Sequence, residues 1–443
     1  MTALTCRTRS LWVVPLLLLV GARLAGAAEP RPSSVRPLDK GATLDNAFAA
    51  LGADTIPDGR LFAPFYDYVI GPHALATEDA VYCAFQNSLG QPQVMVYRTE
   101  AGTWDGPATA SSFGLKADDH GNPSICADRR GHLHVFYGCH GGPMRHARSA
   151  APWGITNWEE QPPATPRATY PQTMLLADGT ICLFYRAGGH MEPWTLRTSG
   201  DDGRTWSEPQ RVVEMRLDPP DKLAAAYCDF FPGSDGRTVH CFWNHKDDNA
   251  ARVTDARPHP WRPLKYPGLH EAVYRYNVYY ARRDPDGAWR NAAGQSLQLP
   301  ISKSEADRRC LVFDSGDEFA MMRTRLAVDR DDRPCIRFGV GVVDWVRLHK
   351  DPRAVLVPVT DHYAHFADGR WQVSRESPKD WPADVTRVIQ APGVSAYGYG
   401  WPASHWYIFA SRQTIDPSVG CCVFLYNDRS GYAVRNGGAA KVD

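Results

Sequence analysis

Four residues between positions 120 and 186 combine side-chain types that can move protons and bind an anion. His120 and His140 carry imidazoles, whose reference pKa of about 6.5 suits proton transfer near neutral pH. Tyr170 offers a phenol that can donate a proton, and Arg186 offers a guanidinium that can bind a carboxylate through two hydrogen bonds. No carboxylate adjoins Arg186 in the sequence, so an anionic ligand is a reasonable partner for it.

Each of the four also has a purely structural interpretation. His120 stands at a strand entrance, in Asp-Asp-His-Gly-Asn-Pro, and His140 follows a strand and is flanked by glycines. Both could be turn histidines that bond nearby carbonyls. Tyr170 precedes a proline, as many packed turn residues do. Arg186 ends an apolar strand, which is the hardest of the four to explain without a ligand.

Short apolar runs separated by polar turns must position these side chains. We predict strands at 80–85, 93–98, 132–137, 144–149, 173–176, 180–185, 195–199, 238–243, 273–282, 335–339, 362–366, 406–411 and 422–427. Several end near a Gly-x-Trp sequence, and the repeat is near 50 residues at first and longer later. Such repeats predict an all-β protein, a β-propeller of about seven four-stranded antiparallel blades.

The organisation of the chain follows from this pattern. Residues 28–58 are rich in Pro, Ser, Ala and Gly and are expected to form a lead-in segment, and 59–443 a single propeller domain. The Ala-rich stretch 222–227 and the stretch 302–309 could each form a short helix. Ser199–Trp206 fits the pattern Ser-x-Asp-x-Gly-x-Thr-Trp, an Asp-box hairpin turn with a structural role. Asp201 and Trp206 are therefore not catalytic candidates.

The charge balance and the N-terminus restrict the class of protein. The 443 residues include 49 basic and 49 acidic side chains, which argues against a nucleic-acid-binding protein with its basic face. Residues 1–27 begin with Arg7 and Arg9, continue with an apolar run and end in small residues, as a secretory signal peptide does. The apolar run is short for a membrane span. We expect a soluble protein that is secreted or periplasmic.

The cysteines indicate buried thiols more than a disulfide framework. Eleven occur, and Cys6 lies in the predicted signal peptide. Cys83, Cys182 and Cys335 stand inside apolar strand-like runs and are predicted to be buried. Export permits disulfides among the others, but spacing gives no pairing. No Cys-x-x-Cys motif occurs, so a zinc ribbon is not indicated.

The segment 118–206 resembles the propeller family that contains the ulvan lyases, which carry sialidase-type BNR repeats. The resemblance rests on DDHGNPSICADRRGHLHVFYGCHGG, TYPQ, LFYRAGG and the Asp-box. In that family the lyase site has two His, one Tyr and one Arg in this order, which match His120, His140, Tyr170 and Arg186. The resemblance implies a seven-bladed propeller and a polysaccharide lyase that cuts a rhamnose–glucuronate glycan.

β-Elimination at a uronate fits these residue types. Arg186 would neutralise the carboxylate so that the C5 proton becomes acidic. His120 would remove that proton, Tyr170 would protonate the departing O4, and His140 would orient them or exchange roles with His120. Which group is acid and which is base stays open at this point.

Further residues are candidates for binding. Asn122, His190 and His245 are candidates for contact with the substrate. No metal is required by this chemistry. The resemblance allows a structural zinc, for which His245, His259, His270 and Cys310 are possible ligands, although their spacing matches no strong motif.

Three other functions compete with the lyase. An α-L-rhamnosidase-type hydrolase on the same propeller could use His73, which can equally be a turn residue. A sialidase would require an Arg-Ile-Pro start, which the sequence lacks. A non-catalytic glycan-binding propeller is compatible with the same fold. In each case we expect a monomer whose partner is a glycan, anionic for the lyase.

Overall fold

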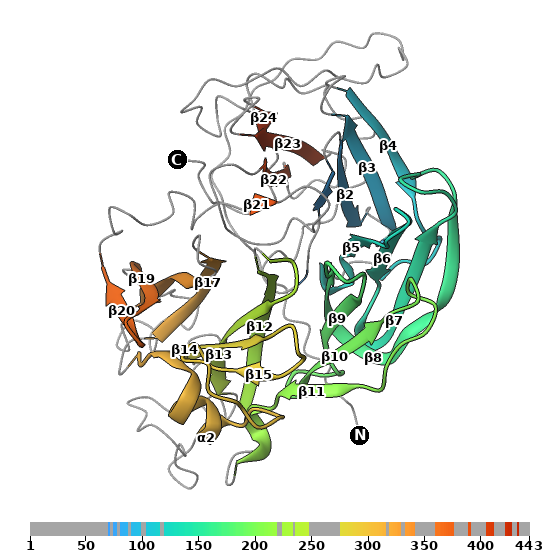
Figure 1. Cartoon of the computed structure of the whole chain (residues 1–443). Coiled ribbons are helices and arrows are strands. Elements are labelled where there is room, and N and C mark those ends of the chain that lie inside the picture. The colour runs from blue at the N-terminus through green and yellow to red at the C-terminus, as the bar shows by residue number, and fades with distance from the viewer. Residues whose placement is uncertain are drawn as a thin grey trace, which may run out of the picture. The chain divides into compact units, whose positions relative to one another are not determined.

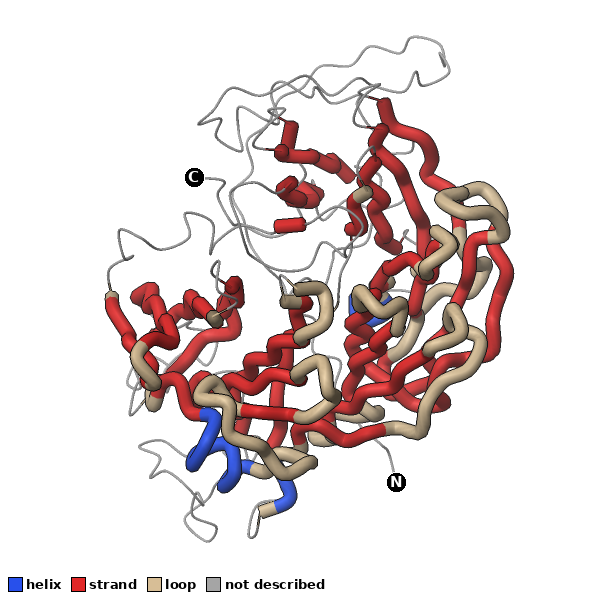
Figure 2. Tube along the Cα trace, viewed as in Figure 1, coloured by secondary structure: helices blue, strands red, loops and turns tan. Residues whose placement is uncertain are grey.

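Antiparallel β-sheets dominate the protein in a computed structural model of the whole chain (Figures 1 and 2). Helix is confined to short segments, shown blue in Figure 2. The all-β class is therefore confirmed. The structure describes residues 70, 74–77, 80–86, 90–98, 103–115, 119–218, 224–233, 235–247, 275–315, 319–328, 333–341, 359–375, 389–390, 405–411, 421–427 and 432–433.

Two sheets come from the first half of the chain. The first has the order β1-β2-β3-β4 and consists of β1 (Ala74–Ala76), β2 (Ala80–Gln86), β3 (Pro92–Arg98) and β4 (Thr103–Thr109). The second has the order β11-β10-β9-β8-β7-β6-β5. It consists of β5 (Ser124–Ala127), β6 (Leu133–Tyr137), β7 (His140–Ser149), β8 (Trp158–Leu175), β9 (Ile181–Arg186), β10 (Trp194–Ser199) and β11 (Gln210–Val213).

Three sheets follow. The third has the order β12-β13-β14-β15, with β16 also paired to β14. It consists of β12 (Ala224–Pro232), β13 (Val239–Asp247), β14 (Arg275–Arg283), β15 (Trp289–Arg290) and β16 (Leu311–Phe313). The fourth joins β17 (Phe319–Val328), β18 (Pro334–Gly341), β19 (Val359–Ala367) and β20 (Arg370–Ser374). The fifth joins β21 (Ile389–Gln390), β22 (His405–Ser411), β23 (Cys421–Asn427) and β24 (Tyr432–Ala433).

The second sheet differs from the separate four-stranded blades that the repeat predicts. Strand β8 is 18 residues long, and its two parts pair with different neighbours. Its first part, up to Thr169, pairs with β7, and the part from Thr169 to Leu175 pairs with β9. One continuous strand thus joins two groups of strands, β5–β8 and β8–β11, into a single sheet. The sequence repeat predicts where strands form, but it does not reveal that two groups of strands have one strand in common.

The two predicted short helices have different outcomes. The stretch 302–309 is helical, as α2 (Lys303–Glu305) followed by the π-helical η5 (Ala306–Cys310). The prediction for 222–227 is wrong, because β12 begins at Ala224 and pairs along its whole length with β13. Strand pairing and burial of both its faces outweigh the helix propensity of alanine here.

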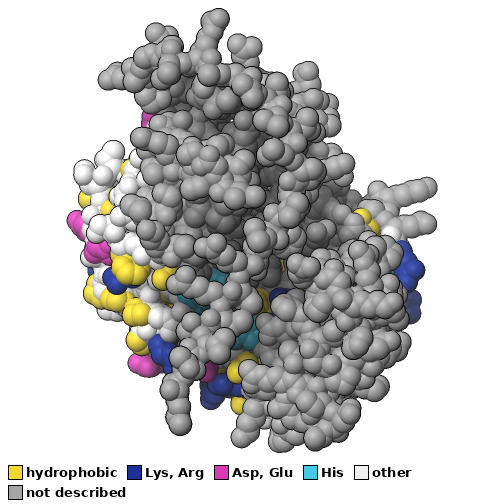
Figure 3. Space-filling view, turned by 180° about the vertical axis from the view of Figure 1, so that it is seen from behind, with side chains coloured by type: hydrophobic (Ala, Val, Ile, Leu, Met, Phe, Trp, Pro, Cys, Tyr) yellow, Lys and Arg dark blue, Asp and Glu magenta, His cyan; other side chains and the backbone are white. Residues whose placement is uncertain are grey.

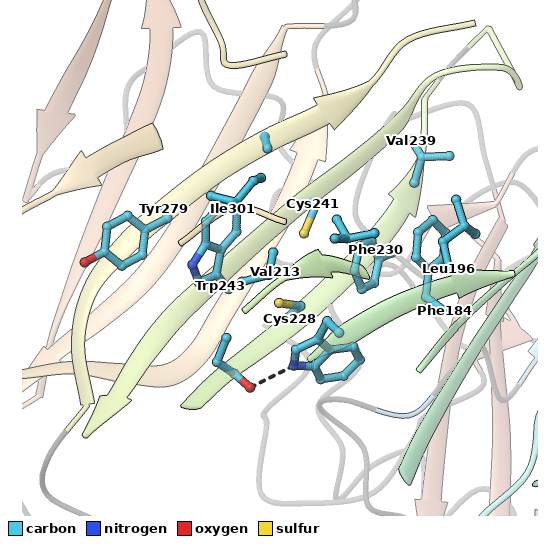
Figure 4. Close-up of a cluster of buried hydrophobic side chains, with 14 of the residues drawn as sticks. Phe184, Leu196, Val213, Cys228, Phe230, Val239, Cys241, Trp243, Tyr279 and Ile301 are labelled. Carbon is cyan, nitrogen blue, oxygen red and sulfur yellow. Dashed lines mark hydrogen bonds between the residues drawn. The ribbon is translucent and has the colours of Figure 1, made fainter. Parts of the chain in front are cut away.

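A buried cluster joins the second and third sheets (Figure 4). Phe184 of β9 stacks on Phe230 of β12 with ring centroids 3.9 Å apart. Trp194 Nε1 donates a hydrogen bond to the Ala226 carbonyl at 2.8 Å. Gln172 Nε2 donates to the Cys228 carbonyl at 2.7 Å. Aromatic stacking and side-chain hydrogen bonds therefore fix β8, β9 and β10 against β12, which fixes the side chains at their ends.

The Asp-box has the structural role that its sequence indicates. Asp201 accepts hydrogen bonds from the Thr205 backbone N–H at 2.9 Å and from the Thr205 hydroxyl at 2.6 Å. These bonds lower the pKa of the Asp201 carboxyl to about 2. Gly203 has a φ of 78°, and the Trp206 ring packs edge-on against Phe136.

The cysteine prediction is confirmed for the three that it named. Cys83, Cys182 and Cys335 are buried and unbridged, as are five further cysteines of the described chain, Cys126, Cys139, Cys228, Cys241 and Cys310. No helix in the described segments is both long and apolar enough to cross a membrane. The predicted signal peptide 1–27 and the lead-in segment 28–58 lie outside the described residues.

Candidate active site

The structure brings the four sequence-predicted residues into one cluster. The imidazoles of His120 and His140 stack with centroids 3.9 Å apart and planes within 5°. The His120 ring also lies 5.4 Å from the ring of Tyr170. The Arg186 guanidinium carbon lies 4.6 Å from the centroid of the same Tyr170 ring. His120 and Tyr170 therefore link the exposed His140 to the buried Arg186.

Strand register explains why these residues meet although 66 positions separate the first from the last in the sequence numbering. His140 pairs with Thr169, Thr169 pairs with Arg186, and Arg186 pairs with Trp194, in one row across β7, β8, β9 and β10. Residues directly opposite one another on neighbouring strands lie about 4.5–5.5 Å apart. The short 3-10 helix η1 (Asp119–Gly121) supplies His120 from outside this row.

Thr169 fixes the row and was not singled out from the sequence. Its hydroxyl donates a hydrogen bond to the Gly188 carbonyl at 2.7 Å. The same oxygen accepts a hydrogen bond from the Gly141 N–H at 2.9 Å. The side chain is fully buried. It therefore links the start of β7, where His140 stands, to the loop that follows Arg186. No local sequence pattern distinguishes this threonine from others in strands.

Tyr170 has an unusual backbone conformation. The sequence places it before a strand, but in the structure it lies within β8, where the register shifts between Thr169 and Gln172. Its φ is 63°, which is rare for a residue with a bulky side chain. Such strain costs about 1–3 kcal/mol and concentrates at functional sites. The irregularity re-aims the Tyr170 side chain, as β-bulges beside active sites do.

Arg186 is a buried cation without an ionic partner in the described chain. Its side chain is 2% exposed, and its Nε and Nη1 atoms are buried with no hydrogen-bond partner among the described residues. Its surroundings are the faces of Tyr170 and Tyr227, with the second centroid 5.7 Å away. Leaving buried donors of a charged group unmet is costly. A bidentate anion would satisfy both.

Tyr227 extends the cluster onto the third sheet, and no sequence pattern marked this residue as a candidate. Its ring lies 5.9 Å from that of Tyr170. Its hydroxyl lies 3.2 Å from His190 Nδ1, and Lys246 Nζ lies 2.9 Å from His190 Nε2. His190, a sequence-predicted binding residue, thus contacts Tyr227, which in turn contacts Arg186. Only the packing of two sheets brings Tyr227 to this place.

The other two predicted binding residues are buried. Asn122 directly follows η1, so it borders the segment that carries His120, and its side chain is fully buried. His245 is 1% exposed and lies on β13 with its ring 5.9 Å from that of Tyr276. Histidine side chains reach the surface beside hydrophobic and basic ones on the face shown in Figure 3.

A zinc site is not assembled by the described residues. They contain no group of three His, Cys, Asp or Glu side chains that could hold a metal ion. Cys310 is buried near Cys241, which is four residues, about 13 Å, along β13 from His245. His259 and His270 lie outside the described residues, as does His73.

A second group of histidines has a structural role. His134 Nδ1 lies 2.8 Å from His146 Nε2, and His134 Nε2 lies 3.4 Å from Asp128 Oδ2. Burial lowers the pKa of both histidines. All three side chains are enclosed, so no substrate reaches them. Neutral rings satisfy the contacts if His146 donates to His134 and His134 donates to Asp128.

The fold and the comparisons define the class of protein. The chain belongs to the BNR repeat-containing family, whose profile matches residues 80–377, more than half of the chain. A solved structure of a PL25 ulvan lyase is similar with a TM-score of 0.60 at 22% sequence identity, over 73% of this chain and 74% of that chain. This likeness shows the fold.

Curated relatives carry the same name. An ulvan lyase of Alteromonas sp. (strain LOR) is 28% identical over 300 residues, covering 61% of this chain and 58% of that protein. An ulvan lyase of Nonlabens ulvanivorans is 28% identical over 396 residues, covering 82% of this chain and 79% of that protein. The match with the Alteromonas relative thus spans less than two thirds of its length.

Proposed function

We propose that this chain is a polysaccharide lyase that cleaves a uronate-containing, ulvan-like glycan by β-elimination. The observation that carries the proposal is the buried Arg186 guanidinium, whose Nε and Nη1 atoms have no partner among the described residues. It contacts the rings of Tyr170 and Tyr227, and Tyr170 in turn lies against the stacked histidine pair. A carboxylate is the planar, bidentate anion that this group binds best. A solved PL25 ulvan lyase that is bound to a glucuronate-containing fragment favours a uronate as its source.

The proposed reaction balances with residues of this cluster. Arg186 binds the uronate carboxylate and stabilises the negative charge that develops when C5 loses its proton. His120, as a neutral imidazole, takes that proton. The electron pair of the C5–H bond forms the C4–C5 double bond, the C4–O4 bond breaks, and Tyr170 donates its proton to O4. His140 stacks on His120 and holds its ring in place.

The substrate proposal follows the relatives. A solved PL25 ulvan lyase holds -[GlcA(1-4)Rha3S]-, in which a sulfated rhamnose adjoins the glucuronate. We propose the same sugar pair for this chain. We also propose that residues 59–443 form a single domain of seven blades. A signal peptide at 1–27 precedes this domain and directs export. The elimination requires no metal, and a structural zinc stays a prediction for metal analysis of the purified protein.

One assay tests the function. The protein is incubated with ulvan, and absorbance near the band of an unsaturated uronyl end is followed while free rhamnose is measured. Absorbance without free rhamnose supports the lyase, free rhamnose without absorbance would favour the hydrolase, and binding without either product would favour a glycan-binding propeller. Tyr170→Phe and Arg186→Ala should each abolish the absorbance change. Full activity in a folded variant would refute the residue assignment.

A further inference from the structure

Two cations face each other at the ends of strands β13 and β14. Lys246 and Arg275 are direct register partners, so their side chains leave the same face of the third sheet. Like charges directly opposite one another are destabilising in an antiparallel pair. A protein that keeps such a pair has a reason other than the stability of the sheet, and a shared anion is the simplest.

Both cations converge on the ring of Tyr227. The Arg275 guanidinium carbon lies 4.5 Å from its centroid, and Lys246 Nζ lies 5.9 Å from it. Arg186 approaches the same ring at 5.7 Å. The guanidinium groups of Arg186 and Arg275 are therefore separated by no more than the sum of their two distances to one ring. This upper limit on their separation is compatible with binding of the anionic groups of two neighbouring sugar units.

Arg275 has no anionic partner within the described chain. It forms no ion pair there, and its Nη1 atom is buried without a hydrogen-bond acceptor among the described residues. Two other arginines of the third sheet are paired, Arg282 with Asp284, and Arg290 with Asp284 and Asp286. Arg283 forms no ion pair among the described residues either, but it has no buried polar atom that lacks a partner there. Arg275 thus combines the lack of an ion pair with a buried Nη1 atom that has no acceptor among the described residues, as expected of an arginine that binds a ligand.

A local irregularity fixes the end of β14 that carries Arg275. The register shifts opposite Trp243 and His245, and Asn277 has a φ of 55°. Ser315 N–H donates to Asn277 Oδ1 at 3.0 Å, and Asn277 Nδ2 donates to the Tyr279 hydroxyl at 3.0 Å, which in turn donates to Asp307 Oδ1 at 2.7 Å. Bulges of this kind re-aim side chains. The strand end is therefore shaped by buried hydrogen bonds.

Lys246 also determines which nitrogen of His190 carries the proton. Its ammonium has only donors, so its contact with His190 Nε2 requires that this nitrogen accept. The proton of a neutral His190 then lies on Nδ1 and is donated to the Tyr227 hydroxyl. This leaves the phenol proton of Tyr227 available for an acceptor on the ligand.

We infer that Lys246 and Arg275, which share the ring of Tyr227 with Arg186, form a second anion-binding subsite that takes a sulfate ester on the sugar next to the uronate. The inference rests on the proposed lyase function for the placement of the uronate at Arg186. The subsite selects for sulfated substrate, while Arg186 selects for the uronate itself.

The test compares sulfated ulvan oligosaccharides with their chemically desulfated counterparts on the full chain. The readout is the ratio of kcat/KM for the sulfated substrate to that for the desulfated one. We expect a ratio well above one for the unmodified chain, and a fall of about tenfold in Arg275→Gln and in Lys246→Gln. Arg283→Gln, at the other end of β14, is the matched control and should leave the ratio unchanged.

Two measurements keep this inference separable from the lyase function. Arg275→Lys keeps the charge and should retain part of the ratio, which a variant that merely misfolds would not do. Calorimetric titration of both oligosaccharides into the unmodified chain and into Arg275→Gln gives the same ratio without turnover. An unchanged ratio in Arg275→Gln overturns the subsite even where elimination continues. Loss of elimination with the binding ratio intact would overturn the lyase and keep the subsite.

Discussion

Replacing Arg186 by methionine should abolish activity and raise the stability of the protein. The Nε and Nη1 atoms are buried without partners among the described residues, and each unmet donor costs about 1–3 kcal/mol. The cation–π contacts with Tyr170 and Tyr227 return roughly 0.5–2 kcal/mol each. At the middle of each range, the two unmet donors cost more than the two cation–π contacts return, so the methionine variant should be about 1–2 kcal/mol more stable. Methionine fills a similar volume and keeps contact with both rings.

Urea unfolding and the elimination assay together measure this effect. The free energy of unfolding should rise, while kcat/KM falls by at least about a hundredfold because the carboxylate loses its partner. Arg148→Met is the control, since Arg148 Nη2 lies 3.0 Å from the buried Asp128 carboxylate. That variant should lose about 1–3 kcal/mol. A destabilised Arg186→Met that still eliminates would mean that Arg186 is a structural residue, and the reasoning would fail.

Three further predictions concern the framework of the site. Thr169→Val removes the hydroxyl that bonds Gly188 and Gly141; it should cost about 1–3 kcal/mol in urea unfolding and lower kcat, and unchanged kcat would contradict its positioning role. Burial lowers the pKa of His146. As the pH decreases below about 6.5, the unfolded chain therefore takes up a proton that the folded chain excludes, and the free energy of unfolding decreases. His146→Phe should reduce that slope by about 1.4 kcal/mol per pH unit, measured by unfolding at pH 5 and 7. Asp201→Ala should lose about 1–3 kcal/mol with kcat/KM retained, and a lost activity in a folded variant would place the Asp-box in the site.

Strand positions and turn chemistry could be predicted because they are local properties. Alternation and apolar runs located β2, β3, β6, β9, β10, β14, β18, β22 and β23 within two residues, but they missed the long N-terminal part of β8 and did not predict β4, β5, β12 or β17. The Asp-box was recognisable because one short stretch contains all of its hydrogen-bond partners. The Ala-rich start of β12 was misjudged, since its pairing partner β13 lies beyond a separate turn. Propensity has little weight against strand pairing of this kind.

The sequence by itself determined what chemistry the side chains of His120, His140, Tyr170 and Arg186 can perform, and it placed His140 and Arg186 correctly at strand ends. The tertiary structure decided that they meet, through a register in which Thr169 pairs with both β7 and β9. It also decided the left-handed backbone of Tyr170 within β8 and the contribution of a second sheet through Tyr227. Contacts between strands and between sheets depend on pairing partners far away in the chain. No local periodicity encodes them.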